Sequence, residues 1–575
     1  MSDLTLPQLL ALDPEALHTL PSGWGAVAGV LSEGATDYGH VARQVPQAWS
    51  DGPAASAANG KLLLLGEDLQ AAHTAARVLS MALEDYAHGM TSLRRRALEV
   101  IYDAEDSGYG IDQTTGTITP PEAPTGPGAR RPVIPVRSLL ESFAAIITEA
   151  RALDDTTARK ITTVTPDEHG VLQRPPGTAL LDRASVAAQR GRDPKAVNDW
   201  WRSLTPEQRG YAIAAYPELV GWLDGVPADA RDQANRINLR TQHDLLVAER
   251  DALAAKLDRL NNLGRPLTPD ERNELQRDNT TGRLAELNRK IGGLEAIGDR
   301  LDKPQPGQPP AYLLGVSPDG SGRAIVAVGN PDAAGNIATY VAGTFTYLDS
   351  EHIHDGLDRS DKMASDAAFL APDTPTSVIM WFGYDAPQSI APEAMQDGWA
   401  DHAAGDLRRF EDGLRATHDG PRAHQTIIGH SYGTTAVGHA ATSGYLNADD
   451  IVFVASPGVG ADHASDLHFG DGGDPSAHVW ATTAAHDVIG AAEGPGQILH
   501  DIGRAMGAPT STDDVNNQHL INGRNPANPT FGGRIFTSAP GTGSGSDVHN
   551  AYWHDGSPAR DNLGRIIVGK YGEVR

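Results

Sequence analysis

The chain contains no cysteine among its 575 residues. This absence excludes a thiol nucleophile, a thiolate metal site and a disulfide framework, although it leaves the cellular compartment open. Long apolar runs are missing too, since no stretch approaches the roughly 18 consecutive apolar residues of a membrane span. The first ten residues, MSDLTLPQLL, lack the basic region and apolar core of a Sec signal peptide. We therefore expect either a cytoplasmic protein or export by another route.

Positive charge is scarce relative to negative charge. Lysine and arginine together number 47 against 74 aspartates and glutamates, which gives a formal net charge of −27 at pH 7. Nucleic acids and anionic membranes bind basic surfaces, so neither is expected as a partner. The hydrophobic content of 39% is ordinary for a soluble globular protein, and the length predicts several domains.

Apolar residues spaced by three and four predict a long helix within residues 1–115. They are Leu62, Leu65, Leu69, Ala72, Ala76, Leu79, Leu83, Tyr86, Met90, Leu93 and Ala97. Similar spacing from Trp24 to Val45 predicts an earlier helix. The break around Trp49 predicts that the two helices fold back as an antiparallel hairpin. The proline-rich segment 116–135, with TPPEAPTGPGARRP, predicts a linker.

A second helical region is predicted over residues 136–310. Its signal is a leucine repeat on two segments that a turn at residues 262–266 separates. The residues are Leu239, Leu246, Leu253 and Leu260, then Leu284, Leu287, Ile291, Leu294 and Leu301. This pattern predicts an antiparallel coiled-coil pair, which either packs on the following domain or stands off from it.

Beyond residue 310 short apolar, β-branched runs alternate with helix-length segments. The runs are Ala311–Val316, Ala324–Val328, Ile337–Ala342, Ser377–Phe382, Gln425–Ile428, Ile451–Ala455, His478–Thr482 and Arg534–Thr537. The first two flank the turn sequence PDGSG and predict an antiparallel hairpin. The rest predict a mostly parallel sheet with helices on both faces. Eight strands in this arrangement predict an α/β-hydrolase fold over residues 311–575.

The pentapeptide Gly429-His430-Ser431-Tyr432-Gly433 follows the fifth of these strands. A Gly-x-Ser-x-Gly between a strand and a helix is typical of the nucleophile elbow of α/β-hydrolases. There the serine occupies a strained turn, and the flanking glycines let neighbouring backbone pass close to it. We therefore predict Ser431 as a nucleophile, with Gly429 and Gly433 shaping the elbow.

The candidate acid and base follow the seventh and eighth strands, as the hydrolase plan requires. Asp487 follows the run 478–482, and His549 follows the run 534–537 through a glycine-rich loop. Because loops at the carboxyl ends of parallel strands converge, Ser431, Asp487 and His549 are predicted to meet as a triad. Competing candidates are Asp462, Asp466 and Asp547 for the acid and His554 for the base. His430 and His486 are predicted to pack into the fold.

An oxyanion hole needs preorganised N–H donors. We assign the backbone of Tyr432, the residue after the nucleophile, together with Thr344 or Phe345 from the turn after the third strand. Two loops rich in ligand-type side chains, His352–Asp355 and Asp462–Asp474, lack a complete metal-ligand set. No metal and no cofactor are expected.

The amino-terminal region resembles the WXG-type substrates of actinobacterial type VII secretion, in which a Trp-Gly turn joins two helices. Tyr102-Asp103-Ala104-Glu105-Asp106 matches the Tyr-x-x-x-Asp/Glu export signal of that family. In this chain two residues, and not one, separate Trp49 from Gly52. The resemblance implies a secretion partner and a type VII-like route. The alternative is a purely structural hairpin.

From about residue 193 onward the chain resembles an actinobacterial α/β-hydrolase family long known as a domain of unknown function (number 1023). The matching segments are Gly225–Ala228, Arg231–Arg236, Ala327–Asp332, Phe382–Pro387, Gly429–Gly433, Trp480–Asp487, Phe531-Gly532 and His549–Trp553. One departure is Phe345, which stands where the family's oxyanion turn has a second glycine. The resemblance implies a serine hydrolase and leaves the substrate open.

The leading hypothesis is a serine esterase or lipase-like enzyme that acts on a small-molecule or lipid-like ester through an acyl-enzyme. A first alternative is a secreted or surface interaction protein of a type VII-like system, in which the hydrolase domain is inert or secondary. A second alternative is a peptidase or thioesterase, which uses the same chemistry.

Overall fold

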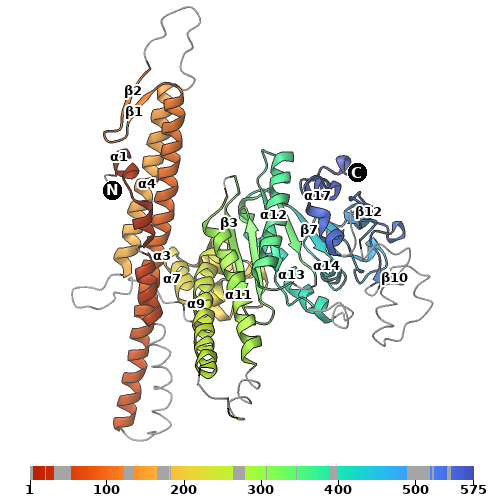
Figure 1. The fold of residues 1–575 in the computed structure, drawn as a ribbon, viewed down its shortest axis with the longest axis horizontal. Helices are drawn as coiled ribbons and strands as arrows, with labels where there is room; N and C mark the ends of the chain where they lie inside the picture. Colours follow the sequence, from red (N-terminus) through yellow and green to blue (C-terminus); the bar gives the residue numbers. More distant parts are fainter. Residues whose placement is uncertain are drawn as a thin grey trace, which may run out of the picture. The chain divides into compact units, whose positions relative to one another are not determined.

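The computed structural model describes residues 4–19, 21–31, 53–121, 135–164, 181, 183–262, 268, 279–305, 307–344, 346–387, 398–487, 519–520, 523–540 and 546–575. The chain divides into two compact units (Figure 1). The first comprises Met1–Leu181 with Pro206–Ala215, and the second comprises Asp182–Thr205 with Tyr216–Arg575.

The first unit is built on two long helices that lie side by side, α3 (Pro53–Asp106) and α4 (Val136–Val164) (Figure 1). Two short helices, α1 (Leu6–Leu10) and α7 (Pro206–Ala215), and a hairpin of β1 (Gly110–Asp112) and β2 (Thr117–Thr119) complete it. Its core contains Leu9, Met90, Leu93, Ala97, Ile101, Leu139, Phe143 and Ile146. These side chains join α1, α3 and α4 into one apolar cluster.

The predicted turn at Trp49 lies outside the described residues. Residues 21–31 lie antiparallel along α3, because Ser80 Oγ donates to Pro21 O at 2.9 Å and His73 Nδ1 lies 2.9 Å from Ala28 O. The first residues of the predicted linker form β2 instead, since Thr117–Thr119 pairs with Gly110–Asp112. Tyr102, from the predicted export signal, is 71% exposed near the end of α3. Its role in export stays a prediction.

The second unit begins with helices, two of which contact the edge strand of a sheet. The helices are α5 (Arg183–Ala187), α6 (Pro194–Ser203), α8 (Pro217–Val220), α9 (Ala228–Asn261) and α11 (Thr280–Asp302), and the two that contact the strand are α9 and α11. The leucine-repeat segments correspond to α9 and α11, which contact each other, and α9 also packs on strand β3. Leu239, Leu246, Leu287 and Leu294 are buried in the same cluster as sheet residues. The pair therefore packs on the sheet.

An eight-stranded sheet forms the centre of this unit, in the order β12-β9-β8-β7-β5-β6-β4-β3. The strands are β3 (Ala311–Ser317), β4 (Arg323–Val328), β5 (Asn336–Val341), β6 (Thr376–Phe382), β7 (His424–His430), β8 (Asp450–Val454), β9 (Val479–Thr482) and β12 (Arg534–Ile535). The strands β5 to β9 and β12 run parallel to their neighbours in that set, whereas β4 is antiparallel to β3 and β6. The eight strands and the opening hairpin confirm the predicted α/β-hydrolase fold.

Helices cover both faces of the sheet, so alternate residues of each strand enter different cores. Val326 and Met380 face α11, α12 (Ser350–Leu370) and α17 (Pro558–Ile567). Ile325 and Ile379 face α13 (Gly398–Thr417) and α14 (Tyr432–Thr442). Because β5 to β9 are parallel, their carboxyl ends lie at the same edge of the sheet, where functional loops are expected.

The remaining elements are short. They are β10 (His519–Leu520), β11 (Gly523–Arg524), α16 (Ser546–Asn550) and the 3₁₀ turns η1 (Pro331–Ala333), η3 (Ala464–Asp466), η4 (Pro475–Ala477), η5 (Pro529–Phe531), η6 (Ala551–Trp553) and η7 (Tyr571–Glu573). Among the described residues, no helix is both long enough and apolar enough to cross a bilayer.

A fully buried carboxyl group lies in the core beneath α13. Glu411 accepts a hydrogen bond from Gln425 Nε2 at 2.9 Å, and burial raises its pKa to about 8. The folded state therefore keeps a proton that the unfolded chain, with a pKa of 4.5, releases. Its stabilising contribution is complete below pH 4.5 and is lost as the pH rises through about 8.

We expect Glu411→Gln to flatten this pH dependence. Between pH 5 and pH 8 the free energy of unfolding of the wild type should fall relative to that of the variant by up to about 1.4 kcal/mol per pH unit. Urea unfolding of the full chain at pH 5, 7 and 8 measures the difference. The exposed Glu351 on α12 supplies the control, Glu351→Gln, which should keep the wild-type slope. Equal slopes for the wild type and Glu411→Gln would contradict the assignment.

Candidate active site

Ser431 occupies a strained turn between β7 and α14. Its φ of 55° and ψ of −130° place a non-glycine residue in a sparsely populated backbone region. The turn is fixed on both sides, because Ser431 N–H donates to Val454 O and Thr434 N–H donates to Ser431 O, each at 3.0 Å. Such strain, which costs about 1–3 kcal/mol, gathers at functional sites. This is the geometry expected of a nucleophile elbow.

Glycines surround Ser431 wherever another backbone segment passes close. A Cβ on Gly429 would stand 2.7 Å from Thr434 Cα, and one on Gly433 would meet the carbonyl oxygens of Val341 and Ala342. A Cβ on Gly343, in the turn after β5, would stand 2.7 Å from Ser431 Cβ. Gly433 and Gly343 therefore allow the turn after β5 to lie directly against the elbow, and Gly429 allows the close turn within the elbow itself.

Asp487 and His549 are hydrogen bonded to each other, although 62 residues separate them. His549 Nδ1 lies 2.9 Å from Oδ1 and 3.0 Å from Oδ2 of Asp487, which is completely buried. A neutral imidazole that donates from Nδ1 has an unprotonated Nε2, which can accept a proton. The structure thus brings Asp487 and His549 together, with Nδ1 of the imidazole turned toward the carboxylate.

Tyr552 is a further partner of this pair that the sequence interpretation missed. Its hydroxyl donates to Asp487 Oδ2 at 2.7 Å and accepts from Ala484 N–H at 2.8 Å. Burial, and then the charge of Asp487, raise the pKa of the phenol, so it stays a donor. Helical spacing is the sequence signal that could have identified Tyr552. His549 and Tyr552 are three residues apart on the continuous α16–η6 segment, and residues so spaced share one face.

We expect Tyr552→Phe to lower kcat/KM for an ester substrate by roughly 10- to 100-fold with little change in KM, because Asp487 loses a charge-assisted hydrogen bond. Steady-state kinetics of the wild type and the variant measure both kcat/KM and KM. Tyr571→Phe is the matched control, since Tyr571 also donates to a buried aspartate, Asp450, at the amino end of β8. That variant should keep kcat/KM within about twofold. Equal losses in both variants would refute a specific role for Tyr552.

His430 and Arg359 hold the segment that carries His549. His430 Nε2 donates to His549 O at 2.9 Å, and the two rings are 4.8 Å apart. Burial, and then the neighbouring His549 and Arg359, lower the pKa of His430 well below its ordinary value. Arg359 donates to Asn550 Oδ1 at 3.0 Å and lies over the Trp553 ring. His430 is buried, as predicted, and it also joins the elbow to the His549 segment.

The candidate oxyanion donors lie at the elbow, beside Ser431. Gly343 approaches Tyr432 N, since a Cβ there would be 3.0 Å away, and Thr344 follows Gly343 directly. The turn is braced, because Thr346 Oγ1 donates to Gly343 O at 2.7 Å and the Tyr384 hydroxyl donates to Ala342 O at 2.8 Å. Phe345, the other predicted donor, lies outside the described residues.

The competing candidates lie elsewhere. Asp466 accepts from His463 N–H in a local turn, and Asp462 and His554 are exposed. The side chain of Asp547 lies outside the described residues. His486 is exposed, so the prediction that it packs into the fold is wrong. The segment His352–Asp355, predicted as a loop, lies in helix α12 instead. There His352 Nδ1 lies 2.8 Å from Asp349 Oδ1, and no group of three ligand-type side chains forms within the described ranges.

One expected contact is not formed. Ser431 Oγ makes no hydrogen bond to His549 or to any other described residue, so the three predicted triad members are joined only as Asp487 with His549. His549 nevertheless lies beside the elbow, through its hydrogen bond with the residue that precedes Ser431. Hydrogen bonds of catalytic groups are often long in unliganded sites and shorten when substrate binds.

Comparison with known proteins gives the following matches. Residues 317–494 match the family described as "Alpha/beta hydrolase". The uncharacterized Mycobacterium tuberculosis protein Rv2079 is 32% identical over 383 residues, which cover 65% of this chain and 55% of Rv2079. The uncharacterized proteins Rv0963c of Mycobacterium tuberculosis and Mb0988c of Mycobacterium bovis are 33% identical over 184 residues, or 31% of this chain and 68% of theirs.

This chain thus spans about half the length of Rv2079. The family match includes β4 to β9 with Ser431 and Asp487, and it ends before His549. This match, together with the strand order and the elbow after β7, determines the family. The chain is related to these mycobacterial proteins, and its carboxy-terminal part belongs to the α/β-hydrolase family.

Proposed function

We propose that the protein is a serine hydrolase that cleaves carboxylic esters through an acyl-enzyme, with Ser431 as nucleophile, His549 as general base and Asp487 as its orienting acid. The observation that carries the proposal is the hydrogen bond between the buried Asp487 and His549 Nδ1, beside the strained turn at Ser431. A serine hydroxyl is a weak nucleophile unless a neighbouring base takes its proton.

The reaction follows from these positions. Ser431 Oγ attacks the ester carbonyl carbon while His549 Nε2 takes the hydroxyl proton, and Asp487 stabilises the imidazolium. The N–H groups of Tyr432 and of the Gly343-Thr344 turn bind the oxyanion. His549 then gives the proton to the leaving alcohol, and water repeats the sequence to release the acid.

A panel of substrates tests the proposal and separates its neighbours. The full chain and Ser431→Ala are compared on p-nitrophenyl esters of increasing acyl length, on a thioester and on peptide p-nitroanilides. We expect ester hydrolysis by the wild type and a loss of roughly 10³-fold or more in Ser431→Ala. Preferential cleavage of the thioester or the anilide would assign the site to a thioesterase or a peptidase. Equal ester rates in both proteins would refute the nucleophile.

A further inference from the structure

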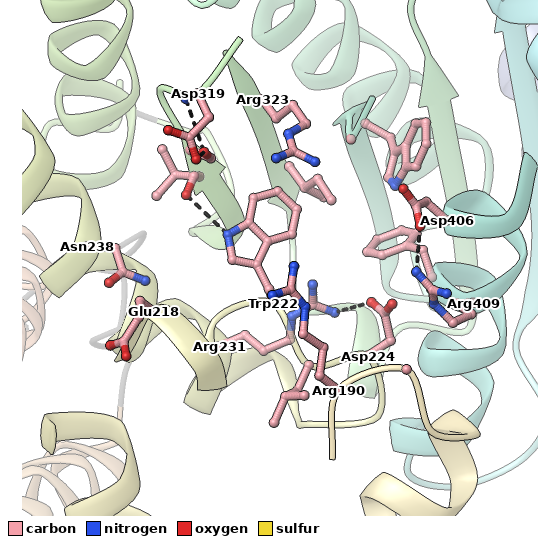
Figure 2. Close-up of a pocket in the computed structure, with 18 of the residues that line it drawn as sticks. Arg190, Glu218, Trp222, Asp224, Arg231, Asn238, Asp319, Arg323, Asp406 and Arg409 are labelled. Carbon is pink, nitrogen blue, oxygen red and sulfur yellow. Dashed lines mark hydrogen bonds and ion pairs between the residues drawn. The ribbon is translucent and has the colours of Figure 1, made fainter. Parts of the chain in front are cut away.

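A cavity lies within the hydrolase unit, apart from Ser431. It has a volume of about 340 Å³, and it lies among the β3–β4 hairpin, the start of α9, the turn before α6, and α13 (Figure 2). The residues that line it do not include Ser431, Asp487 or His549. Its size is at the lower end of ligand pockets, which span roughly 300–1,000 Å³.

The lining is rich in arginine, although the chain as a whole is strongly acidic. Five arginines contribute to it: Arg190, Arg192, Arg231, Arg323 and Arg409. Figure 2 shows Arg190, Arg231 and Arg323 gathered around Trp222. Against these five arginines the lining holds four carboxylates, so its formal charge is slightly positive in a protein with a net charge of −27.

The carboxylates of the cavity are already engaged. Arg231 Nη1 donates to Asp224 Oδ1 at 3.0 Å, and Arg409 Nη2 donates to Asp406 Oδ1 at 2.5 Å. The other two acids also have partners: Glu218 accepts from Arg183 at 2.9 Å, and Asp319 accepts from Ser317 Oγ at 3.0 Å. Three of the four carboxylates are therefore paired with an arginine, whereas Asp319 accepts from a neutral hydroxyl.

Three of the arginines have no carboxylate partner among the described residues, and one of these, Arg192, donates to Gln189 Oε1 at 2.6 Å. Arg190 is exposed in the turn after α5 and makes no ion pair within the described part of the chain. The guanidinium of Arg323 lies 5.5 Å from the centroid of the Trp222 ring, and its buried Nε meets no acceptor there. Because Trp222 Nε1 donates to Val316 O, the indole is fixed in place. An aromatic wall and three arginines without a carboxylate partner thus share one cavity, and the guanidinium groups of Arg190 and Arg323 meet no acceptor among the described residues.

We propose that this cavity binds a small organic acid, whose carboxylate or phosphate group meets Arg190 and Arg323 and whose apolar part lies against Trp222. Guanidinium groups present paired donors that match the oxygens of carboxylates and phosphates. A neutral ligand forms no ion pair with these two side chains, and a cationic ligand is repelled by them. The site is independent of the proposed esterase chemistry, and its test does not depend on turnover.

The test is calorimetric titration of the full chain with inorganic phosphate, with benzoate and with the neutral benzamide. We expect saturable 1:1 binding of benzoate and phosphate below roughly 10 mM and no binding of benzamide. Arg190→Gln, at an exposed turn where little packing is at risk, should weaken the binding roughly tenfold, and Arg323→Gln should do the same.

Arg159→Gln supplies the control, since it removes the same charge from an exposed side chain of the first unit. It should leave the affinity within about twofold of the wild type. Three outcomes would overturn the proposal: no saturable binding of either anion, equal binding of benzamide and benzoate, or wild-type affinity in both Arg190→Gln and Arg323→Gln. Thermal unfolding of each variant verifies that it is folded.

Discussion

Replacing Asp487 with asparagine is expected to lower kcat/KM for a p-nitrophenyl ester by roughly 10³- to 10⁴-fold, with KM nearly unchanged. An amide at this position keeps the shape of the side chain but no longer fixes the proton on Nδ1 of His549. The imidazole then loses both the required tautomer and the charge that stabilises its protonated form. The effect belongs to the transition state, so it should appear in kcat.

Steady-state kinetics of Asp487→Asn and of Asp466→Asn separate this effect from a general loss of acidic charge. Asp466 is the best-defined of the competing acids, and within the described part of the chain its carboxylate accepts a local hydrogen bond from His463 N–H at 2.8 Å. Asp466→Asn should keep kcat/KM within about twofold of the wild type. If Asp466→Asn lost activity and Asp487→Asn did not, the acid would be misassigned.

Gly343→Ala is the second change with a large expected effect. The new Cβ would stand 2.7 Å from Ser431 Cβ, 2.8 Å from His430 O and 3.0 Å from Tyr432 N. Backbone and Cβ atoms cannot yield as a flexible side chain does, so the turn after β5 must shift away from the elbow. We expect a loss of roughly 10²- to 10³-fold in kcat, as for removal of an oxyanion donor, and about 1–3 kcal/mol in the free energy of unfolding.

Gly405→Ala is its matched control. Gly405 lies within α13, where an added Cβ has nothing within 4 Å. Alanine in a helix interior should stabilise the protein by about 0.5–1 kcal/mol and leave activity intact. Steady-state kinetics measure kcat of both variants, and urea unfolding measures their free energies of unfolding. A Gly343→Ala enzyme with wild-type kcat would show that this turn has no part in the reaction.

The sheet was predictable because its strands are buried on both faces. Each parallel strand appears in the sequence as a short, continuous apolar run, which is a strong local signal. The predicted positions of the strand ends were less accurate, since β7 extends beyond the predicted run to His424 and His430. The last strand is shorter than predicted, because Thr537 N–H donates to the carbonyl of Arg575 and so leaves the ladder.

Contacts between distant segments were harder to predict. The apolar face of α3 was evident from its spacing, but periodicity does not identify the partner, and α4 packs on α3 within the first unit. In the candidate site Asp487 and His549 are hydrogen bonded, whereas Ser431, the third predicted member, is not hydrogen bonded to either of them. Tyr552 and Arg359 were missed, since their roles depend on side-chain geometry across more than 60 residues.

Labelling of the full chain with a fluorophosphonate, followed by peptide mapping, tests the central claim most directly. Such reagents modify a serine that a neighbouring base activates, and they do not require knowledge of the substrate. We predict one modified residue, Ser431, no labelling of Ser431→Ala, and much slower labelling of His549→Gln. Labelling that is unchanged in Ser431→Ala, or absent from the wild type, would contradict the account.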